Sequence, residues 1–191
     1  MMKPLACVFA VLAALTLGAC SVPDTVDRRD VAGLATEIRG LGPDIDPEEA
    51  ERAARIAYDY TSQLAEEYQI PDPPLIHNTK VNRGLRPRGL CWHWAEDMEA
   101  RLKQENFQTL TLHRAIANAD NPFRIDHSTA IISRRGDSMF DGVVLDPWRY
   151  GGKLYWSQLQ ADTRYNWRPR MEVLEWKRQR REEKQRLAFI E

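Results

Sequence analysis

Three residues of the chain, Cys91, His127 and Asp146, have side chains that could together carry out nucleophilic chemistry. Cys91 follows a glycine turn in the stretch GLCWHWAEDM and opens an expected helix. The free N–H groups and the positive dipole end of a helix N-terminus favour the thiolate, which is the nucleophilic form of cysteine. A histidine can take the thiol proton, and a carboxylate can orient the imidazole. These residue types indicate a cysteine that attacks an acyl carbon.

Two predicted strands must bring His127 to Asp146. HSTAIISRR (127–135) and DGVVLDPW (141–148) have the apolar, β-branched composition of strands, with a glycine-containing turn between them. If pairing is symmetric about that turn, His127 lies directly opposite Asp146 with the two side chains about 5 Å apart. A slip by one residue would put them on opposite faces. The same face carries an apolar patch that we expect to pack on the Cys91 helix: Thr129, Ile131 and Val144.

The remaining elements follow from cap signals and periodicity. Asp46-Pro47 followed by two glutamates predicts a helix that runs to about Tyr68. The Cys91 helix should reach about Asn106, with one apolar face at spacings of four, three and four residues. Residues 107–116 alternate as a strand, 154–156 form a short fourth strand, and a charged helix follows Met171. Residues 70–78 read as an irregular stretch in which we expect His77 to be exposed, and residues 78–88 as a loop, with a short helix as the alternative there.

The first twenty residues have the character of a targeting segment. Lys3 precedes an apolar run, 5–17, that is too short to span a bilayer and ends in LGAC. This resembles the lipobox of bacterial lipoproteins. The resemblance implies cleavage before Cys20 and a lipid such as palmitate on that residue. Ser21, in place of an aspartate, favours the periplasmic face of the outer membrane over the inner membrane. A plain signal peptide is the alternative.

Lipidation changes the meaning of the cysteines. Cys7 leaves with the leader and Cys20 carries the lipid, so Cys91 is the only thiol of the mature domain and no internal disulfide can form. Such a thiol is either inertly buried or used. The formal net charge of −1 gives no reason to expect a nucleic-acid partner, and we expect a monomer without a cofactor. Residues 20–70 carry a balance of −7 and residues 164–191 a balance of +4, which we interpret mainly as solvated helix faces.

A family resemblance adds to this interpretation. GLCWHWA, HSTAII and VVLDPW resemble, in their order, the cysteine, histidine and aspartate motifs of transglutaminase-like proteins in the wider papain-like group. The resemblance covers roughly residues 82–155 and implies Cys91, His127 and Asp146 as a catalytic triad. The Cys91 N–H would donate to the oxyanion, with Asn82, Asn78 or a group near Trp92 as the second donor. Trp92 and Trp148 are the candidates for substrate contact, although core packing is the alternative for both.

The sequence thus predicts an α+β fold with a papain-like, transglutaminase-like core, in which N-terminal helices pack on a small antiparallel sheet. We divide the chain into a signal peptide (1–19), a tether (20–43) in which a short helix near Val31 to Arg39 is the alternative, the domain (44–169) and a charged C-terminal helix (170–191).

The leading functional prediction is an envelope-anchored cysteine hydrolase or acyltransferase that acts on amide bonds of cell-wall peptide or an envelope protein. A related NlpC-type peptidase, and a non-catalytic binding or assembly module that kept the fold, are the alternatives. A zinc site is the weakest prediction, because Cys91 and His93 lie two residues apart on a helix and point in different directions. We expect His113 to be structural or at the surface.

Overall fold

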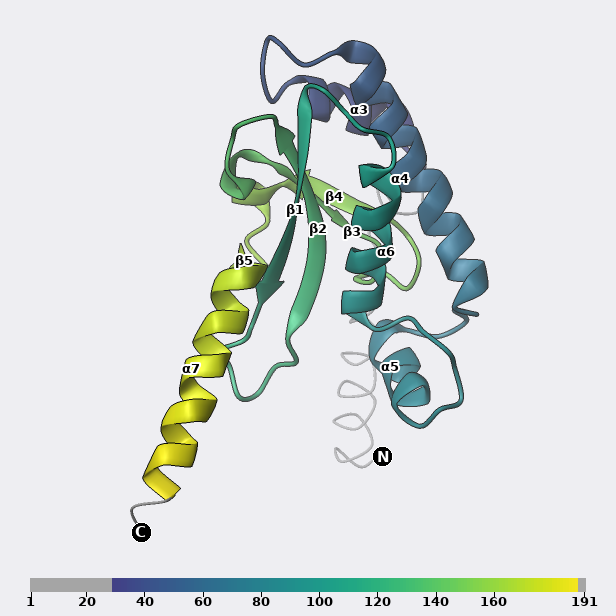
Figure 1. The fold of residues 1–191 in the computed structure, drawn as a ribbon. Coiled ribbons are helices and arrows are strands. Elements are labelled where there is room, and N and C mark those ends of the chain that lie inside the picture. The colour runs from purple at the N-terminus through teal and green to yellow at the C-terminus, as the bar shows by residue number, and fades with distance from the viewer. Residues whose placement is uncertain (1–28, 189–191) are drawn as a thin grey trace, which may run out of the picture.

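The computed structural model describes residues 29–188, which have an α+β fold. Within this range, five α-helices accompany one antiparallel sheet with the strand order β4-β3-β2-β1-β5 (Figure 1). The predicted fold class is confirmed: helices precede and cover the sheet, and a last helix follows it. The predicted signal peptide and Cys20 lie outside the described residues.

The sheet forms from the segments that are rich in apolar and β-branched residues. β1 (Leu110–Ala117) pairs along its whole length with β2 (His127–Arg134), and β2 pairs with β3 (Val143–Asp146). β4 (Tyr155–Gln158) extends the sheet beyond β3, and β5 (Arg168–Pro169) borders β1. The sequence does not predict β5, because two residues that include a proline carry no alternation to recognise.

The pairing of β2 with β3 differs by two residues from the predicted register. Ile131 lies opposite Val144, so that the register, continued toward the end of β3, sets Thr129 rather than His127 opposite Asp146. The cause is the short 3-10 turn η1 (139–141), which occupies one side of the connection and makes it asymmetric. Since side chains alternate with a period of two, a slip by two residues leaves His127 and Asp146 on one face.

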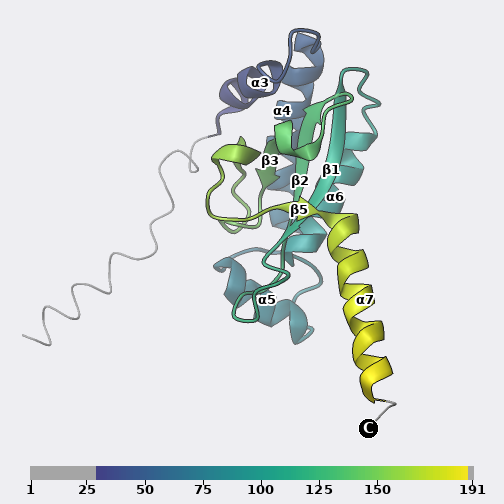
Figure 2. The same ribbon diagram turned by 90° about the vertical axis from the view of Figure 1, so that its left-hand side faces the viewer.

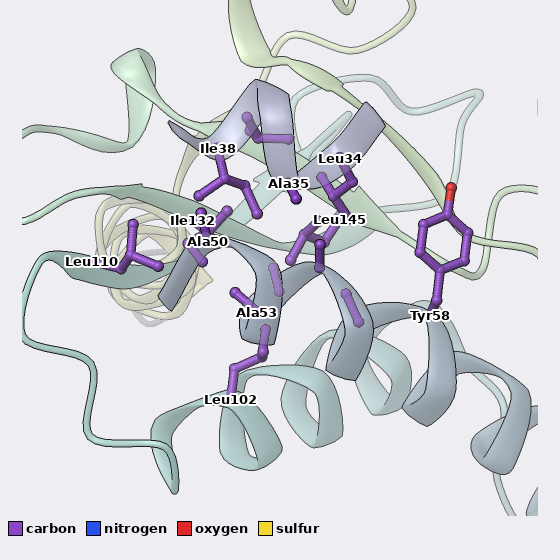
Figure 3. Close-up of a cluster of buried hydrophobic side chains, with 14 of the residues drawn as sticks. Leu34, Ala35, Ile38, Ala50, Ala53, Tyr58, Leu102, Leu110, Ile132 and Leu145 are labelled. Atoms are coloured by element: carbon purple, nitrogen blue, oxygen red, sulfur yellow. The ribbon is translucent and has the colours of Figure 1, made fainter. Parts of the chain in front are cut away.

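The sheet face that packs on α6 (Cys91–Lys103) is not the predicted one. That face is formed by alternate residues of β2 and β3, which share a buried cluster with Met98 and Leu102 of α6 (Figure 3): Ala130, Ile132, Val143 and Leu145. Ile131 and Val144 point to the opposite face and pack with Tyr165 and Trp167. Both strands are buried on both faces, so their apolar composition could not tell the faces apart.

The N-terminal helices form as their caps predict. The Asp46 side chain accepts a hydrogen bond from the Glu48 N–H at 2.8 Å, and Pro47 is the first residue of α4 (Pro47–Glu67). The buried face of α4 consists largely of alanines, which allow α3 and α6 to approach closely: Ala50, Ala53, Ala54 and Ala57. Figure 1 shows α4 beside α6, which lies on the sheet.

Residues 31–43 belong to the folded domain, which corrects the predicted tether of residues 20–43. α3 (Val31–Arg39) starts with the Asp30 side chain accepting from the Gly33 N–H at 2.8 Å. Leu34 and Ile38 are fully buried in the main core cluster. The segment has few large apolar residues, but two of them four residues apart suffice to give a short helix a buried face.

Helix α5 (Pro74–Asn82) occupies the stretch for which a loop was the first interpretation. Two prolines mark its start: Pro73 ends the extended segment and Pro74 is the first helical residue, where a missing N–H costs nothing. His77, which we expected to be exposed, is 1% exposed and sits on the inner side of α5. α5 lies next to the N-terminal end of α6, close to Cys91 (Figure 1).

Helix α7 (Arg170–Ala188) leaves the domain after β5 and projects away from the sheet, as Figures 1 and 2 show from two directions. Val173 in its first turn is its one buried residue. Most of the helix therefore presents charged side chains to solvent. In the described part of the chain, residues 29–188, every helix is too short or too polar to cross a lipid bilayer.

Candidate active site

Cys91 is the first residue of α6, and neighbouring side chains hold the turn that precedes it. The Nδ1 atom of His93 accepts hydrogen bonds from the N–H groups of Gly89 and Leu90, at 3.2 and 3.1 Å. The indole N–H of Trp94 donates to the carbonyl of Gly89 at 3.1 Å. His93 and Trp94 of the WHW motif therefore face inward and hold the turn that precedes Cys91. Their role is in packing and not in substrate contact.

The same turn is closed from the other side by α5. His77 Nε2 is 2.9 Å from the carbonyl oxygen of Arg88. Gly89 has a φ of +119°, and a Cβ atom there would lie 2.4 Å from His77 Nε2. A glycine is needed at this position both for the backbone conformation and for the space that the imidazole takes. The buried position of His77 thus has a structural cause that its proline-rich surroundings did not indicate.

His127 and Asp146 meet where β2 begins and β3 ends. The Nε2 atom of His127 is 2.7 Å from Oδ2 of Asp146, and both side chains are about 1% exposed. The contact runs diagonally across the two strands, as the observed register requires. Two of the predicted site residues are therefore joined, in a geometry different from the direct opposition that we expected.

The thiol of Cys91 lies beside the imidazole of His127. The interaction with Cys91 is one of the causes of the raised pKa of His127, after the carboxylate of Asp146, and the Nδ1 atom of His127 is buried without a hydrogen-bond partner. The S–H group can also donate to the carbonyl of Asp126, 3.5 Å away. Long or poorly aligned contacts between a nucleophile and its base are common in enzymes without bound substrate. The structure therefore brings Cys91, His127 and Asp146 to one spot.

The protonation states follow from the surroundings of each group. Burial alone would lower the pKa of His127, but the carboxylate of Asp146, assisted by Cys91, raises it to about 9. Burial would likewise raise the pKa of Asp146, and the positive charges of His127 and Arg149 hold it below its usual value. At neutral pH the pair is an imidazolium and a carboxylate. For His93, burial and the nearby Arg88 lower the pKa to about 4, so its ring is neutral and free to accept at Nδ1.

Arg149 and Asp162 extend the site inward, and sequence reasoning missed both. Arg149 donates to Asp146 through its backbone N–H at 3.1 Å and its Nε at 2.9 Å. Its two terminal nitrogens reach the Asp162 carboxylate at 3.1 and 2.5 Å, and Trp167 Nε1 donates to that carboxylate at 3.0 Å. The position of Arg149, in the turn three residues after Asp146, was a local signal that could have been used. Asp162 carries no such signal.

Aromatic rings enclose the imidazole. The ring centroids of Trp148, Tyr165 and Trp167 lie 4.6, 4.6 and 5.2 Å from that of His127. Three of the six aromatic residues in the segment 148–167 therefore lie against His127. They exclude water from His127, and they leave its ring little freedom to turn away from Asp146.

A groove of about 490 Å³ opens next to this cluster. Its lining includes the buried residues His127 and Trp148. Exposed apolar residues form its rim: Leu75, Phe123 and Ile125. Of the predicted contact residues, Trp148 lies in the groove, with its indole N–H donating to Asn78 Oδ1 at 3.0 Å. Trp92 is half exposed on α6 and is not part of the groove lining.

The predicted second oxyanion donor has no support in the geometry. Asn82 is exposed at the last position of α5 and does not line the groove. Asn78, the alternative, is engaged with Trp148 through its oxygen, which leaves its NH₂ group as a potential donor. As the first residue of α6, Cys91 has a backbone N–H without an intrahelical acceptor, so it can serve as the first donor.

Metal-ligating residues do not gather at this site. In residues 29–188, no three side chains of the His, Cys, Asp or Glu type lie together in a way that could hold a metal ion. His113 is partly buried on β1, where its Nε2 is 2.8 Å from Ser133 Oγ.

No protein family model, curated protein or solved structure matches the chain.

Proposed function

We propose that the protein is a cysteine hydrolase or acyltransferase that acts on amide bonds. The observation that carries this proposal is His127: Asp146 holds its Nε2 at 2.7 Å, its buried Nδ1 has no hydrogen-bond partner, and Cys91 is close enough to contribute to its raised pKa. A buried imidazole with one nitrogen held by a carboxylate and the other facing a thiol is the arrangement that nucleophilic catalysis by cysteine requires. The resemblance of the three motifs to transglutaminase-like proteins supports the same proposal.

The reaction uses the three side chains in two steps. In the first, His127 is the imidazolium that already holds the proton of the thiol: the Cys91 thiolate forms the Sγ–C bond with the acyl carbon, the C–N bond breaks, and the imidazolium gives its proton to the leaving amine. In the second, water or another amine attacks the thioester and gives up a proton to the now neutral His127, the C–S bond breaks, and the acid or the new amide leaves with the thiolate and imidazolium restored. Asp146 keeps the imidazole oriented in both steps.

The proposed substrate is cell-wall peptide or another protein of the bacterial envelope. This part rests on the lipobox-like LGAC, which ends at Cys20 and implies a lipid anchor on the periplasmic face of the outer membrane. Ten residues lie between Cys20 and Val31, where α3 and the folded domain begin. A lipid on Cys20 would hold the domain within a short chain length of the membrane surface.

Thiol labelling tests the proposal. With Cys7 and Cys20 replaced by serine, so that Cys91 is the only thiol, a peptide that carries a thiol-reactive vinyl sulfone should label the protein once per chain and should not label its Cys91→Ala variant. His127→Ala should slow labelling by about a hundredfold, since proton transfer by a positioned side chain is worth about 10² to 10⁴. The matched control is His113→Ala, which removes an imidazole that contacts Ser133 on the same sheet and should leave the rate unchanged.

Equal labelling rates for the wild-type protein and His127→Ala would overturn the catalytic proposal. That result would favour a binding or assembly module. In such a module Cys91 is an inert buried thiol whose S–H group donates to the Asp126 carbonyl.

A further inference from the structure

The groove beside His127 has an uneven charge. Its lining contains two exposed guanidinium groups, Arg124 and Arg164, and no carboxylate side chain. Arg149 also lines it, but that charge is balanced by Asp146 and Asp162. The groove therefore has an excess of positive charge at its surface, in a protein whose formal net charge is −1.

Both free guanidinium groups stand against the same ring. The central carbon of Arg124 is 5.3 Å from the centroid of Tyr165, and that of Arg164 is 5.8 Å from it. The Tyr165 ring in turn stacks near His127, at 4.6 Å between centroids. An arginine that rests on an aromatic ring keeps its N–H edge available for a carboxylate. The two arginines are thus held one ring away from the proposed base.

The acidic residues nearby are already occupied. Asp126 forms an ion pair with Lys177 of α7, and Asp162 is bound by Arg149 and Trp167. Among residues 29–188, neither Arg124 nor Arg164 has an ion pair with an acidic side chain. Their pairing capacity is directed to solvent and to whatever enters the groove.

We infer that the groove recognises an acyl donor that carries a free carboxylate close to the scissile amide, and that Arg124 and Arg164 bind this carboxylate. The inference rests on the proposed function and narrows its substrate class to acidic peptides. The apolar rim formed by Leu75, Phe123 and Ile125 would contact the neighbouring, uncharged part of the peptide. Arginine pairs suit this task because their planar N–H groups match the two oxygens of a carboxylate.

Two peptide vinyl sulfones that differ only in a glutamate or a glutamine next to the reactive group test this inference. The wild-type protein should react about tenfold faster with the glutamate probe, as expected for a charge-assisted contact. The double variant Arg124→Gln/Arg164→Gln should react with both probes at the same rate, close to the wild-type rate with glutamine. Arg186→Gln, an exposed arginine far along α7, is the control and should keep the preference.

A second measurement uses the smallest possible probes. Iodoacetate and iodoacetamide differ by one negative charge, and the ratio of their rates with Cys91 should fall several-fold in the double variant and stay constant in Arg186→Gln. Thermal unfolding midpoints equal to that of the wild-type protein would show that the exposed substitutions leave the fold intact. A glutamate preference that is absent in the wild-type protein, or that survives in the double variant, would overturn the inference. Equal labelling rates for the wild-type protein and His127→Ala would instead overturn the proposed function.

Discussion

Four buried charges alternate in sign through the centre of the site. His127, Asp146, Arg149 and Asp162 are each less than a tenth exposed, and each carboxylate lies between two donors. A buried charge is tolerated only when it is paired and hydrogen-bonded. With His127 protonated the four charges sum to zero, which is consistent with the raised pKa of that residue. The orientation of the imidazole therefore depends on Arg149 and Asp162 as well as on Asp146.

Replacing Arg149 by methionine should reveal this dependence. Arg149→Met leaves two carboxylates buried without their shared cation, and we expect a loss of about 3 to 5 kcal/mol in the free energy of unfolding. Urea unfolding measures this loss. Arg168→Met is the matched control: its ion pair with Glu172 is largely exposed and should be worth less than about 1 kcal/mol. Similar losses for the two variants would show that the buried chain of charges contributes little.

The raised pKa of His127 predicts how stability depends on pH. Below the ordinary pKa of about 6.5 the folded and unfolded states are both protonated, and the ion pair contributes in full. Between about pH 6.5 and pH 9 the unfolded state releases the proton that the folded state keeps, so stability falls as pH rises, by at most about 1.4 kcal/mol per unit.

Urea unfolding of Cys91→Ala and of Cys91→Ala/His127→Gln between pH 6 and pH 9.5 isolates this effect, because the thiol is absent from both and Asp146 still raises the pKa of His127. The free energy of unfolding should fall more steeply with pH for Cys91→Ala. His93 and His113 have lowered pKa values, and both are present in the two variants, so their contributions cancel in the comparison. Parallel pH profiles would mean that His127 is not protonated in the folded protein.

At the scale of elements, the N-terminal turn of α6 determines where the thiol lies. α6 has no side-chain cap from Leu90, and His93 supplies the missing acceptor from inside the helix, bonded to two N–H groups. α4 uses the common arrangement, with the Asp46 carboxylate bonded to Glu48. The two helix starts can therefore be compared: the cap formed by His93 lies next to Cys91, whereas the cap formed by Asp46 does not.

His93→Ala and Asp46→Ala should each cost about 1 kcal/mol of stability, as lost caps do. Only His93→Ala should slow vinyl sulfone labelling of Cys91. This variant frees the backbone of Gly89 and Leu90, directly before Cys91, and so shifts the thiol relative to His127. The two variants are compared by urea unfolding and by labelling rate at pH 7. A labelling rate for His93→Ala equal to that of Asp46→Ala would show that the turn before Cys91 keeps its position without the imidazole.

Elements were predictable where local patterns decide and unpredictable where distant contacts decide. The start of α4, the start of α6 and the extent of β2 follow from caps and composition, whereas β1 begins three residues later than predicted. The register of β2 on β3 depends on the turn η1, and the choice of packing face depends on helices far away in sequence. The pairing of His127 with Asp146 survived the wrong register only because the error was an even number of residues.

The candidate site shows the same division. Cys91, His127 and Asp146 were identifiable because their chemistry and spacing are local signals. Asp162 joins the site through Arg149, and no pattern in the sequence marks so distant a partner. The oxyanion donor proposed at Asn82 fails for a related reason, since α5 forms where a loop was expected and ends with Asn82 in solvent.

At the scale of the whole molecule, the site lies at one end of the sheet, where the loop 118–126 joins β1 to β2. One side of this loop contributes Phe123, Arg124 and Ile125 to the groove beside His127. Its other side faces α7 across a second groove that includes Asp120 and Arg181, and Lys177 of α7 forms an ion pair with Asp126. The first two turns of α7 thus belong to the support of the site, whereas its outer half extends beyond it (Figure 2).

A truncation separates the two halves of α7. A chain that ends at Gln179 keeps the buried Val173 and the ion pair of Lys177, and it should unfold within about 0.5 kcal/mol of the full chain, because exposed residues that are far from packed contacts contribute little. Labelling of Cys91 should also be unchanged. Val173→Ala, which empties a fully buried position, should cost about 2 kcal/mol. A clear loss of stability or labelling in the truncated chain would mean that the outer half of α7 contacts the domain in solution.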